Sequence, residues 1–198
     1  MTLGTVVGLF ADIHGTTETL REALVECRAE GVTTIALLGD LLDRTEQADP
    51  CAAILACWEV VGVYGNHERE IALAAARGTI DLRAETIRLL SGLQEEVAIG
   101  DILLTHDAEQ WGQHQSPLAR LLHHSEAHGQ EAQARITFAG HTHFRQARDE
   151  RGTIDITRGR LVLDPRRRYL INPGALAAGQ FAIWDRTTRV IQFRQIEW

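Results

Sequence analysis

The chain has 198 residues, a formal net charge of -7, and 20 basic residues that are all arginine. A hydrophobic content of 44% and a charged content of 24% are typical of a globular domain that buries a real core. Because lysine is absent, mechanisms that use a lysine nucleophile or a Schiff base are excluded, and the acidic balance argues against a surface for duplex nucleic acid.

The three cysteines, Cys27, Cys51 and Cys57, are odd in number and lie within apolar or helical patterns. We expect them to be buried small hydrophobic residues in a reducing compartment and not parts of a disulfide framework. The chain starts without a basic signal-peptide region and has no apolar run of about 18 residues or more, so we expect neither a signal peptide nor a membrane helix. The predicted location is the cytoplasm.

The first half of the sequence alternates short apolar strands with helices. The predicted strands are residues 5–10, 33–38 and 59–64, and the predicted helices are residues 17–30, 49–57, 69–77 and 81–91. We expect Thr17 to cap the first helix, and Asp49-Pro50 to provide the N-cap and first position of the second. A β-α-β opening implies parallel strands joined by a right-handed crossover.

After Gly92 the pattern changes to shorter strands separated by turns. The predicted strands are residues 95–99, 101–104, 135–139, 169–172, 180–184 and 190–195. The first two predict a hairpin around Gly100, and the last three predict a meander of antiparallel strands. Residues from about 107 to 134 have no strand pattern and contain several histidines, so we expect a loop-helix insertion there.

Five of the predicted strands end in residues that can ligate metals. These residues are Asp12 and His14, Asp40 and Asp43, Asn66 and His67, His106, and His141 and His143. Each cluster alone is more typical of a turn, but open α/β sheets place ligand sites at the carboxyl ends of their strands. Carboxylate, imidazole and amide oxygen suit Mn²⁺, Fe²⁺ or Zn²⁺, and the lack of thiolates argues against a structural zinc site.

A carboxylate has two oxygens with spare lone pairs, so Asp40 could bridge two ions. Two ions held ~3.5–4 Å apart can clamp both oxygens of an in-line phosphoryl displacement. The sequence therefore predicts about four protein ligands for each of two ions, with Asp40 shared.

Five motifs, in this order along the chain, resemble the motif set of the calcineurin-like metallophosphoesterase superfamily. They are Asp12-Ile13-His14, Gly39-Asp40-Leu41-Leu42-Asp43-Arg44, Gly65-Asn66-His67-Glu68, Thr105-His106-Asp107 and Gly140-His141-Thr142-His143. Asn172-Pro173-Gly174 resembles a further signature of the small bacterial members. The resemblance implies an α/β fold, a four-layer α-β-β-α sandwich of two mixed sheets with outer helices, in which residues 1–198 form a single domain.

The same resemblance implies how the ligands divide between two divalent transition-metal ions. One ion would be held by Asp12, His14, Asp40 and His143, and the other by Asp40, Asn66, His106 and His141. Mn²⁺ is the expected metal, with Fe, Zn or Ni as alternatives.

The residue after Asn66 is informative because many small bacterial phosphodiesterase-like members have cysteine there, whereas this chain has His67. In the resembling protein phosphatases and dinucleoside polyphosphate hydrolases, this histidine pairs with an aspartate, and the arginine after that aspartate contacts phosphate. The resemblance implies these two roles for Asp43 and Arg44. A histidine positioned by a carboxylate can protonate a leaving alkoxide, and a guanidinium can bind phosphate oxygens bidentately. For Arg44 a surface ion pair is the alternative, because Thr45 replaces the glycine usual in protein phosphatases.

These observations predict a dinuclear metal-dependent phosphoesterase that cleaves a small phosphate ester by metal-activated hydroxide, with His67 as general acid. One alternative is a phosphodiesterase for cyclic or dinucleotide-type substrates. The others are a non-catalytic binding scaffold of the same fold and a mononuclear metallohydrolase acting on amides. The expected partner is the small phosphate ester, with no membrane and no nucleic-acid duplex, and the sequence leaves the oligomeric state open.

Overall fold

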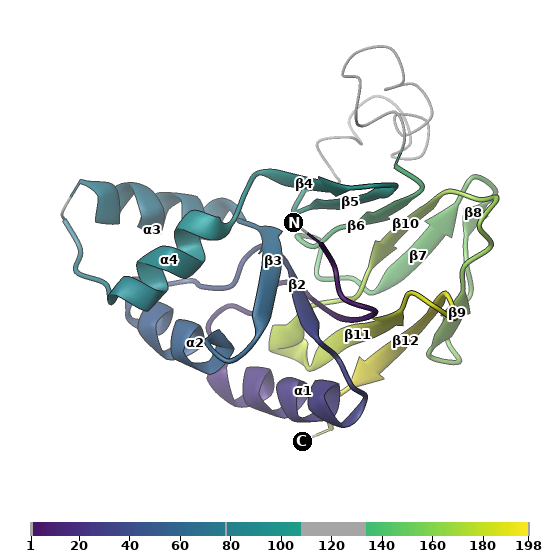
Figure 1. The fold of residues 1–198 in the computed structure, drawn as a ribbon, viewed down its shortest axis with the longest axis horizontal. Helices are drawn as coiled ribbons and strands as arrows, with labels where there is room; N and C mark the ends of the chain where they lie inside the picture. Colours follow the sequence, from purple (N-terminus) through teal and green to yellow (C-terminus); the bar gives the residue numbers. More distant parts are fainter. Residues whose placement is uncertain (1, 78, 108–133, 198) are drawn as a thin grey trace, which may run out of the picture.

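The computed structural model describes residues 2–77, 79–107 and 134–197, which form two six-stranded sheets with helices beside them (Figure 1). The predicted insertion at about 107–134, with its histidines, lies outside these residues apart from its two ends. Within the described ranges, no helix is both long enough and apolar enough to cross a membrane.

The first sheet has the strand order β3-β2-β1-β11-β12-β9. Its strands are β1 (Val6–Phe10), β2 (Thr34–Leu38), β3 (Glu59–Val63), β9 (Arg160–Val162), β11 (Gln180–Asp185) and β12 (Val190–Gln195). β1, β2 and β3 are parallel, as the β-α-β pattern predicts, while β11, β12 and β9 continue the sheet in antiparallel pairs. All five residues of β2 are buried, which explains its uninterrupted apolar sequence.

The second sheet has the order β4-β5-β6-β10-β7-β8. Its strands are β4 (Glu96–Ile99), β5 (Ile102–Thr105), β6 (Ile136–Phe138), β7 (Gln146–Asp149), β8 (Gly152–Thr153) and β10 (Tyr169–Asn172). β4 and β5 form the predicted hairpin, and β5, β6 and β10 are parallel neighbours. Both sheets are therefore mixed, which confirms the predicted fold class.

Two apolar clusters hold these layers together. One lies between the sheets and includes Val7, Leu38, Leu104, Phe138 and Trp184. The other joins the opposite face of the first sheet to the helices, through residues such as Phe10, Ile35, Leu20 and Leu55. The helices are α1 (Thr17–Ala29), α2 (Ala48–Leu55), α3 (Asn66–Ala76) and α4 (Ala84–Gly92).

Within the described residues, the outer helical layer is thus found on the side of the first sheet, where α1, α2, α3 and α4 all contribute to the second cluster.

The two predicted helix caps differ from the structure, and α3 and α4 begin at Asn66 and Ala84 instead of at residues 69 and 81. Thr17 is the first residue of α1 and not its cap, because Thr16 occupies the N-cap position. α2 begins at Ala48, directly after a 3₁₀ turn at Thr45–Gln47, so Asp49 lies inside the helix. The Asp49 carboxylate accepts hydrogen bonds from the Arg83 backbone N–H (3.1 Å) and the Thr86 hydroxyl (2.5 Å), and it thereby ties α2 to the start of α4.

The C-terminal strands also differ from prediction. The expected single meander is wrong, because β10 belongs to the second sheet while β11 and β12 belong to the first. The short strands β7, β8 and β9 were not predicted, and their two to four residues are too few to show a clear alternation. Cys27 and Cys51 are buried as expected, and burial raises the pKa of each thiol to about 12, but Cys57 is exposed.

Candidate metal centre

The five strands that end in predicted ligands are β1, β2, β3, β5 and β6, and the structure brings the residues that follow them together. Parallel strands deliver their carboxyl ends to the same edge of a sheet, and the two sheets share such an edge here. Three groups have ligand atoms that all lie within 4.8 Å of one another. The first group is Asp12, His14 and His143, the second is Asp40, His106 and His141, and a third, His14, Asp40 and His67, shares residues with both.

The backbone at this edge has an unusual conformation. Among the described residues, six that are not glycine have a positive φ, and five of these six are predicted ligands: Asp12, His14, Asp40, His141 and His143. Their φ angles lie between 49° and 67°, in the left-handed region that costs energy for residues with a Cβ atom. Such strain persists only where surrounding structure holds it, and it concentrates at functional sites.

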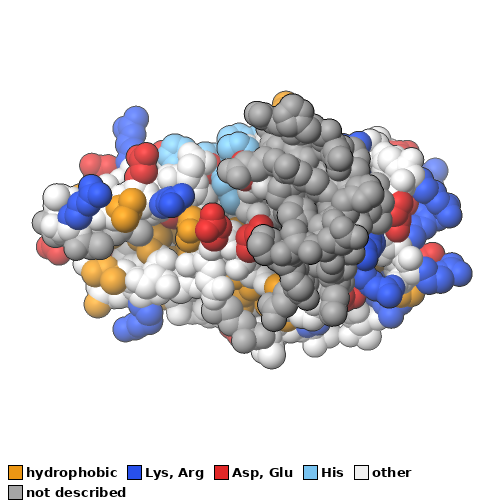
Figure 2. Space-filling model, turned by 90° about the horizontal axis from the view of Figure 1, so that it is seen from above, with side chains coloured by type: hydrophobic (Ala, Val, Ile, Leu, Met, Phe, Trp, Pro, Cys, Tyr) orange, Lys and Arg blue, Asp and Glu red, His pale blue; other side chains and the backbone are white. Residues whose placement is uncertain are grey.

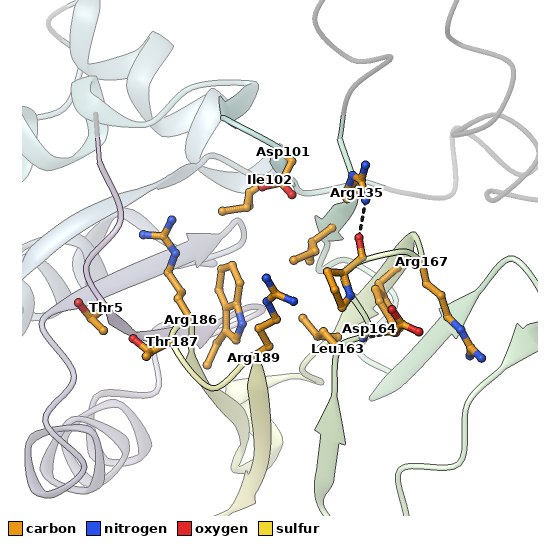
Figure 3. Close-up of a pocket in the computed structure, with 14 residues that line it drawn as sticks. Thr5, Asp101, Ile102, Arg135, Leu163, Asp164, Arg167, Arg186, Thr187 and Arg189 are labelled. Atoms are coloured by element: carbon orange, nitrogen blue, oxygen red, sulfur yellow. Dashed lines mark hydrogen bonds between the residues drawn. The ribbon is translucent and has the colours of Figure 1, made fainter.

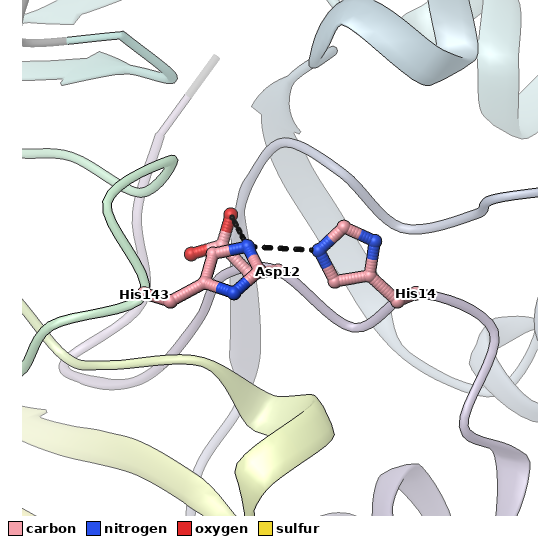
Figure 4. Close-up of side chains that lie close together, drawn as sticks. All are labelled: Asp12, His14 and His143. Atoms are coloured by element: carbon pink, nitrogen blue, oxygen red, sulfur yellow. Dashed lines mark hydrogen bonds and ion pairs between the residues drawn. The ribbon is translucent and has the colours of Figure 1, made fainter.

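The first group joins the loops after β1 and β6 (Figure 4). His14 Nε2 and His143 Nε2 are 3.0 Å apart, and His143 Nε2 is 3.7 Å from Asp12 Oδ1. Asp12 is fully buried, and its Oδ1 also accepts the backbone N–H of His141 at 2.9 Å. These three side chains therefore converge on one point with their ligating atoms facing inward.

The second group joins the loops after β2, β5 and β6. His106 Nε2 lies 3.3 Å from Asp40 Oδ2 and 3.3 Å from His141 Nδ1. His106 Nδ1 is 2.8 Å from the Leu38 carbonyl oxygen, so this nitrogen carries the proton and donates it. The free lone pair of His106 is then on Nε2, the atom that faces Asp40, which is the orientation expected of a metal-ligating histidine.

Hydrogen bonds within the site do not satisfy all of its oxygen atoms, which favours bound cations. Asp12 Oδ2 and Asp40 Oδ1 are buried and have no hydrogen-bond partner. Burial raises the pKa of Asp12 above the usual value for an aspartate, although the hydrogen bond from His141 opposes this. For Asp40, burial is outweighed by the hydrogen bond and charge of His106, so its pKa is lowered. Buried carboxylate oxygens without partners are costly unless a cation or donor reaches them, which supports a metal site here.

The pKa of His106 responds in the opposite direction to that of Asp40. Burial alone would lower the pKa of His106, but its hydrogen bond to Asp40 raises it overall. A charge-assisted pair with Asp40 forms when Nε2 also carries a proton, and a bound ion would take the place of that proton.

Glycine is required at two positions because the ligand loops approach closely. A Cβ atom on Gly39 would lie 2.3 Å from His106 Nδ1, and one on Gly65 would lie 2.0 Å from Asp40 Oδ1. Both distances are far below van der Waals contact, so the glycines of the two motifs make space for the ligand side chains.

Glu68 organises the loops after β2 and β3, a role that the sequence analysis did not assign. This side chain is 1% exposed and accepts backbone N–H groups from Gly65 (2.7 Å), Leu42 (2.8 Å) and Asp40 (3.0 Å). Burial raises its pKa, the backbone donors of Gly65 and Leu42 oppose that shift, and the negative charge of Asp40 adds to it. The signal for this role was present in the sequence, because Glu68 closes the Gly65-Asn66-His67-Glu68 motif.

Asn172 has a similar role for the loop after β6. Its amide nitrogen donates to the Gly140 carbonyl (2.8 Å) and to the Thr142 hydroxyl (3.1 Å), while its oxygen accepts the Gly174 backbone N–H (2.8 Å). The Asn172-Pro173-Gly174 signature therefore positions the segment that carries His141 and His143.

The remaining predicted site residues, Asn66, His67, Asp43 and Arg44, differ from the prediction in their position or their contacts. Asn66 and His67 are the first residues of α3, and not loop residues as predicted, and the His67 ring lies edge-on to the His14 ring at 5.8 Å. Asp43 does not pair with His67 as the resemblance implied, because its Oδ1 lies 2.5 Å from His14 Nδ1. Arg44 is exposed, and within the described residues its guanidinium has no hydrogen-bond or ion-pair partner.

A cavity of about 500 Å³ adjoins the second group of ligands. Asn66, His106 and His141 line it, together with Arg69 and several acidic residues on its rim. Figure 2 shows histidine side chains gathered on one part of the surface seen from above, so the ligand cluster is open on this side. A small substrate can therefore reach the ligands from the surface.

Comparison with known proteins agrees with this geometry. A model of the calcineurin-like phosphoesterase superfamily domain matches residues 6–190. An uncharacterized protein of Methanocaldococcus jannaschii is 20% identical over 98% of this chain and 88% of its own length.

Two solved structures have a similar fold. A metallophosphoesterase from Sphaerobacter thermophilus has a TM-score of 0.72 at 22% identity, covering 98% of this chain and 89% of its own. A structure described as a novel archaeal phosphodiesterase has a TM-score of 0.61 at 18% identity, covering 96% and 99%. With a family model that spans most of its length and a sandwich of the same architecture, the chain belongs to the calcineurin-like phosphoesterase superfamily.

Proposed function

We propose that this chain is a dinuclear metal-dependent phosphoesterase that hydrolyses a small phosphate ester. The observation that carries the proposal is the pair of three-residue ligand groups in which two buried carboxylates each keep one oxygen without a partner. Two divalent ions there would supply Lewis-acid activation of water and neutralise charge on the phosphoryl group.

The proposed ligands follow from these groups. Asp12, His14 and His143 would hold one ion, and His106, His141 and Asn66 the other, with Asp40 between them because it lies close to His106, His14 and His67. The all-nitrogen and oxygen donor set supports Mn²⁺ as the native metal, with Fe, Zn or Ni as alternatives.

His67 is the proposed general acid. It is half-buried next to His14 and Asp40, where it can reach a leaving oxygen without replacing a metal ligand. A positioned histidine can protonate an alkoxide as the ester bond breaks. Asp43 was expected to position His67, but we propose that it positions His14 instead. Its carboxylate contacts Nδ1 of His14, and Nε2 of that ring then faces His143. Arg44, exposed and unpaired among the described contacts, is the proposed phosphate-binding cation.

A phosphodiesterase is the second candidate. The contact of Asp43 with His14 favours a phosphodiesterase, because an Asp43-His67 pair was one of the features expected of an enzyme for monoesters. A non-catalytic scaffold is disfavoured by the complete donor set, and a mononuclear amidase by the second ligand group.

We also propose that residues 1–198 form one catalytic domain, that the segment at about 107–134 is an insertion in it, and that the protein works in the cytoplasm. Limited proteolysis and fractionation of the native cell test them.

The proposal is tested by metal analysis combined with a substrate panel. We expect two Mn²⁺ per chain at saturation, and hydrolysis that a chelator abolishes and Mn²⁺ restores. The panel contains p-nitrophenyl phosphate, bis-p-nitrophenyl phosphate and a dinucleoside polyphosphate. Full activity with a single ion would refute the dinuclear site. If the protein binds two ions but cleaves none of the esters, the non-catalytic binding scaffold is the better description.

A further inference from the structure

A second cavity, of about 540 Å³, lies at the other end of the strands (Figure 3). It is lined by Thr5, which precedes β1, and by the first residues of three strands: Ile102 of β5, Ile136 of β6 and Tyr169 of β10. His106 lies four residue steps along the chain from Ile102, so at ~3.3 Å per step these two residues are roughly 13 Å apart. A small molecule bound in this cavity therefore does not reach the proposed metal ligands.

The cavity is basic in a protein that is acidic overall. Four arginines and two aspartates line it, whereas the whole chain has a net charge of -7. One of the aspartates, Asp164, is already paired with Arg166 at 3.0 Å, and this pairing lowers its pKa to about 2. Its charge is thus balanced from outside the cavity, as is that of Arg167, which pairs with Asp149 at 2.7 Å. Three arginines and Asp101 remain, so the cavity still has an excess of positive charge.

The arginines come from separate parts of the chain. Arg186 donates to the Leu3 carbonyl and lies 5.7 Å from the Trp184 ring, while Arg135 donates to the Pro165 carbonyl. In the view of Figure 3, Arg189 lies between these two. It is exposed, and within the described part of the chain its guanidinium has no hydrogen-bond or ion-pair partner. Arg189 is therefore free to bind an anion, with two anchored arginines beside it.

The second, independent observation is a buried donor on the cavity wall. Trp184 is 3% exposed and packs against Phe138 with ring centroids 5.0 Å apart, yet its indole Nε1 is buried without a hydrogen-bond partner. The indole N–H can only donate, and a buried donor without an acceptor is rare in folded proteins. Because this nitrogen has no contact with solvent, a ligand in the cavity would lie against the Trp184 ring and would reach Nε1 only after neighbouring side chains moved.

We propose that this cavity is a binding site for a phosphorylated small molecule, separate from the metal centre. The guanidinium of Arg189 would bind the phosphate oxygens, with Arg186 and Arg135 adding positive charge, and the ligand would lie beside the Trp184 ring. Several converging cations favour a dianionic phosphate monoester over a monoanionic group, because the Coulomb energy grows with charge. The volume is that of a small-molecule site and accommodates a nucleotide-sized ligand.

The test follows the Trp184 indole N–H by NMR in chelator-treated protein, because without metal ions the proposed catalytic centre neither hydrolyses the probe nor binds it through a metal. A Trp184→Phe variant, which keeps the aromatic packing, assigns the resonance. The probes are adenosine monophosphate, uncharged adenosine, and succinate. We expect adenosine monophosphate to shift the resonance saturably and adenosine to leave it unchanged.

Arg189→Ala should weaken binding of adenosine monophosphate about tenfold or more, since a charge-assisted hydrogen bond is lost. Arg158→Ala, which removes the same charge from an exposed residue outside the cavity, should leave the affinity unchanged. The proposal is wrong if adenosine monophosphate leaves the resonance unmoved, if the two variants respond alike, or if succinate binds and the phosphate ester does not. Because no hydrolysis is measured, the outcome is independent of the proposed catalytic function.

Discussion

The two ends of the same strands carry opposite chemistry. At the carboxyl ends, buried carboxylates and histidines are held by a strained backbone and by Glu68 and Asn172. At the other end, two exposed and two half-buried arginines surround a cavity, and side-chain contacts anchor three of the four. Metal ligation, which we propose for the first end, requires fixed positions, whereas anion binding, which we propose for the second, tolerates long, flexible side chains, because a guanidinium can adapt to its ligand.

The largest effect should come from the residue between the two ligand groups. Asp40→Asn removes one negative charge and should release at least one ion, with hydrolysis falling roughly 100-fold or more. Metal analysis and turnover at saturating Mn²⁺ measure both effects. Asp81→Asn, an exposed aspartate outside both sites, should retain two ions and full turnover. Equal losses in the two variants would show that net charge, and not position, controls this end.

The next effect concerns the proposed acid. His67→Ala should lower turnover by ~10²–10⁴-fold on esters with poor leaving groups, such as glycerol phosphate. Hydrolysis of p-nitrophenyl phosphate should fall much less, because p-nitrophenolate needs little protonation. If both substrates lose turnover to the same extent, His67 is a structural neighbour of His14 and not the acid.

A third effect tests the rigidity of the metal end. Glu68→Ala leaves three backbone N–H groups without their acceptor, so we expect a loss of about 3 kcal/mol or more in the free energy of unfolding. Urea denaturation of the metal-free protein measures it. Glu59→Ala is the matched control, since Glu59 is exposed at the other end of β3 and accepts one hydrogen bond of 3.4 Å, so the change should stay within about 0.5 kcal/mol. Similar losses in the two variants would mean that the hydrogen bonds to Glu68 do not stabilise the loops more than an ordinary surface contact does.

The smallest expected effect is on substrate preference. Arg44→Ala should raise KM for p-nitrophenyl phosphate several-fold and change KM for bis-p-nitrophenyl phosphate less, because a dianion attracts a guanidinium more strongly than a monoanion does. Arg158→Ala should change neither. If bis-p-nitrophenyl phosphate is cleaved far faster and Arg44→Ala affects both esters alike, the enzyme is a phosphodiesterase.

The sequence predicted the metal end better than it predicted the rest of the fold. Each apolar run before Asp12, Asp40, Asn66, His106 and His141 forms a strand, because a buried strand needs a continuous apolar segment and little else. The convergence of these residues follows from parallel strand direction. The pairing of Asp43 with His14 could not be predicted, because it depends on the relative placement of two loops separated by a helix.

The C-terminal half was less predictable for a physical reason. β10 and β11 are both short alternating runs, and local pattern cannot show that one joins the second sheet and the other the first. The arginine-lined cavity could not be predicted either, since Arg135 is far along the chain from Arg186 and Arg189 and each alone is typical of a solvated surface residue.

The left-handed backbone at five ligand positions has an evolutionary consequence. At about 1 kcal/mol for each residue with a Cβ atom, five such residues take on the order of 5 kcal/mol from a domain whose net stability is ~5–15 kcal/mol. Glycine at any of them would relieve the strain but remove a ligand. Selection for stability alone would therefore favour glycine at these positions, and ions bound at the proposed site would offset part of that pressure by stabilising the folded chain.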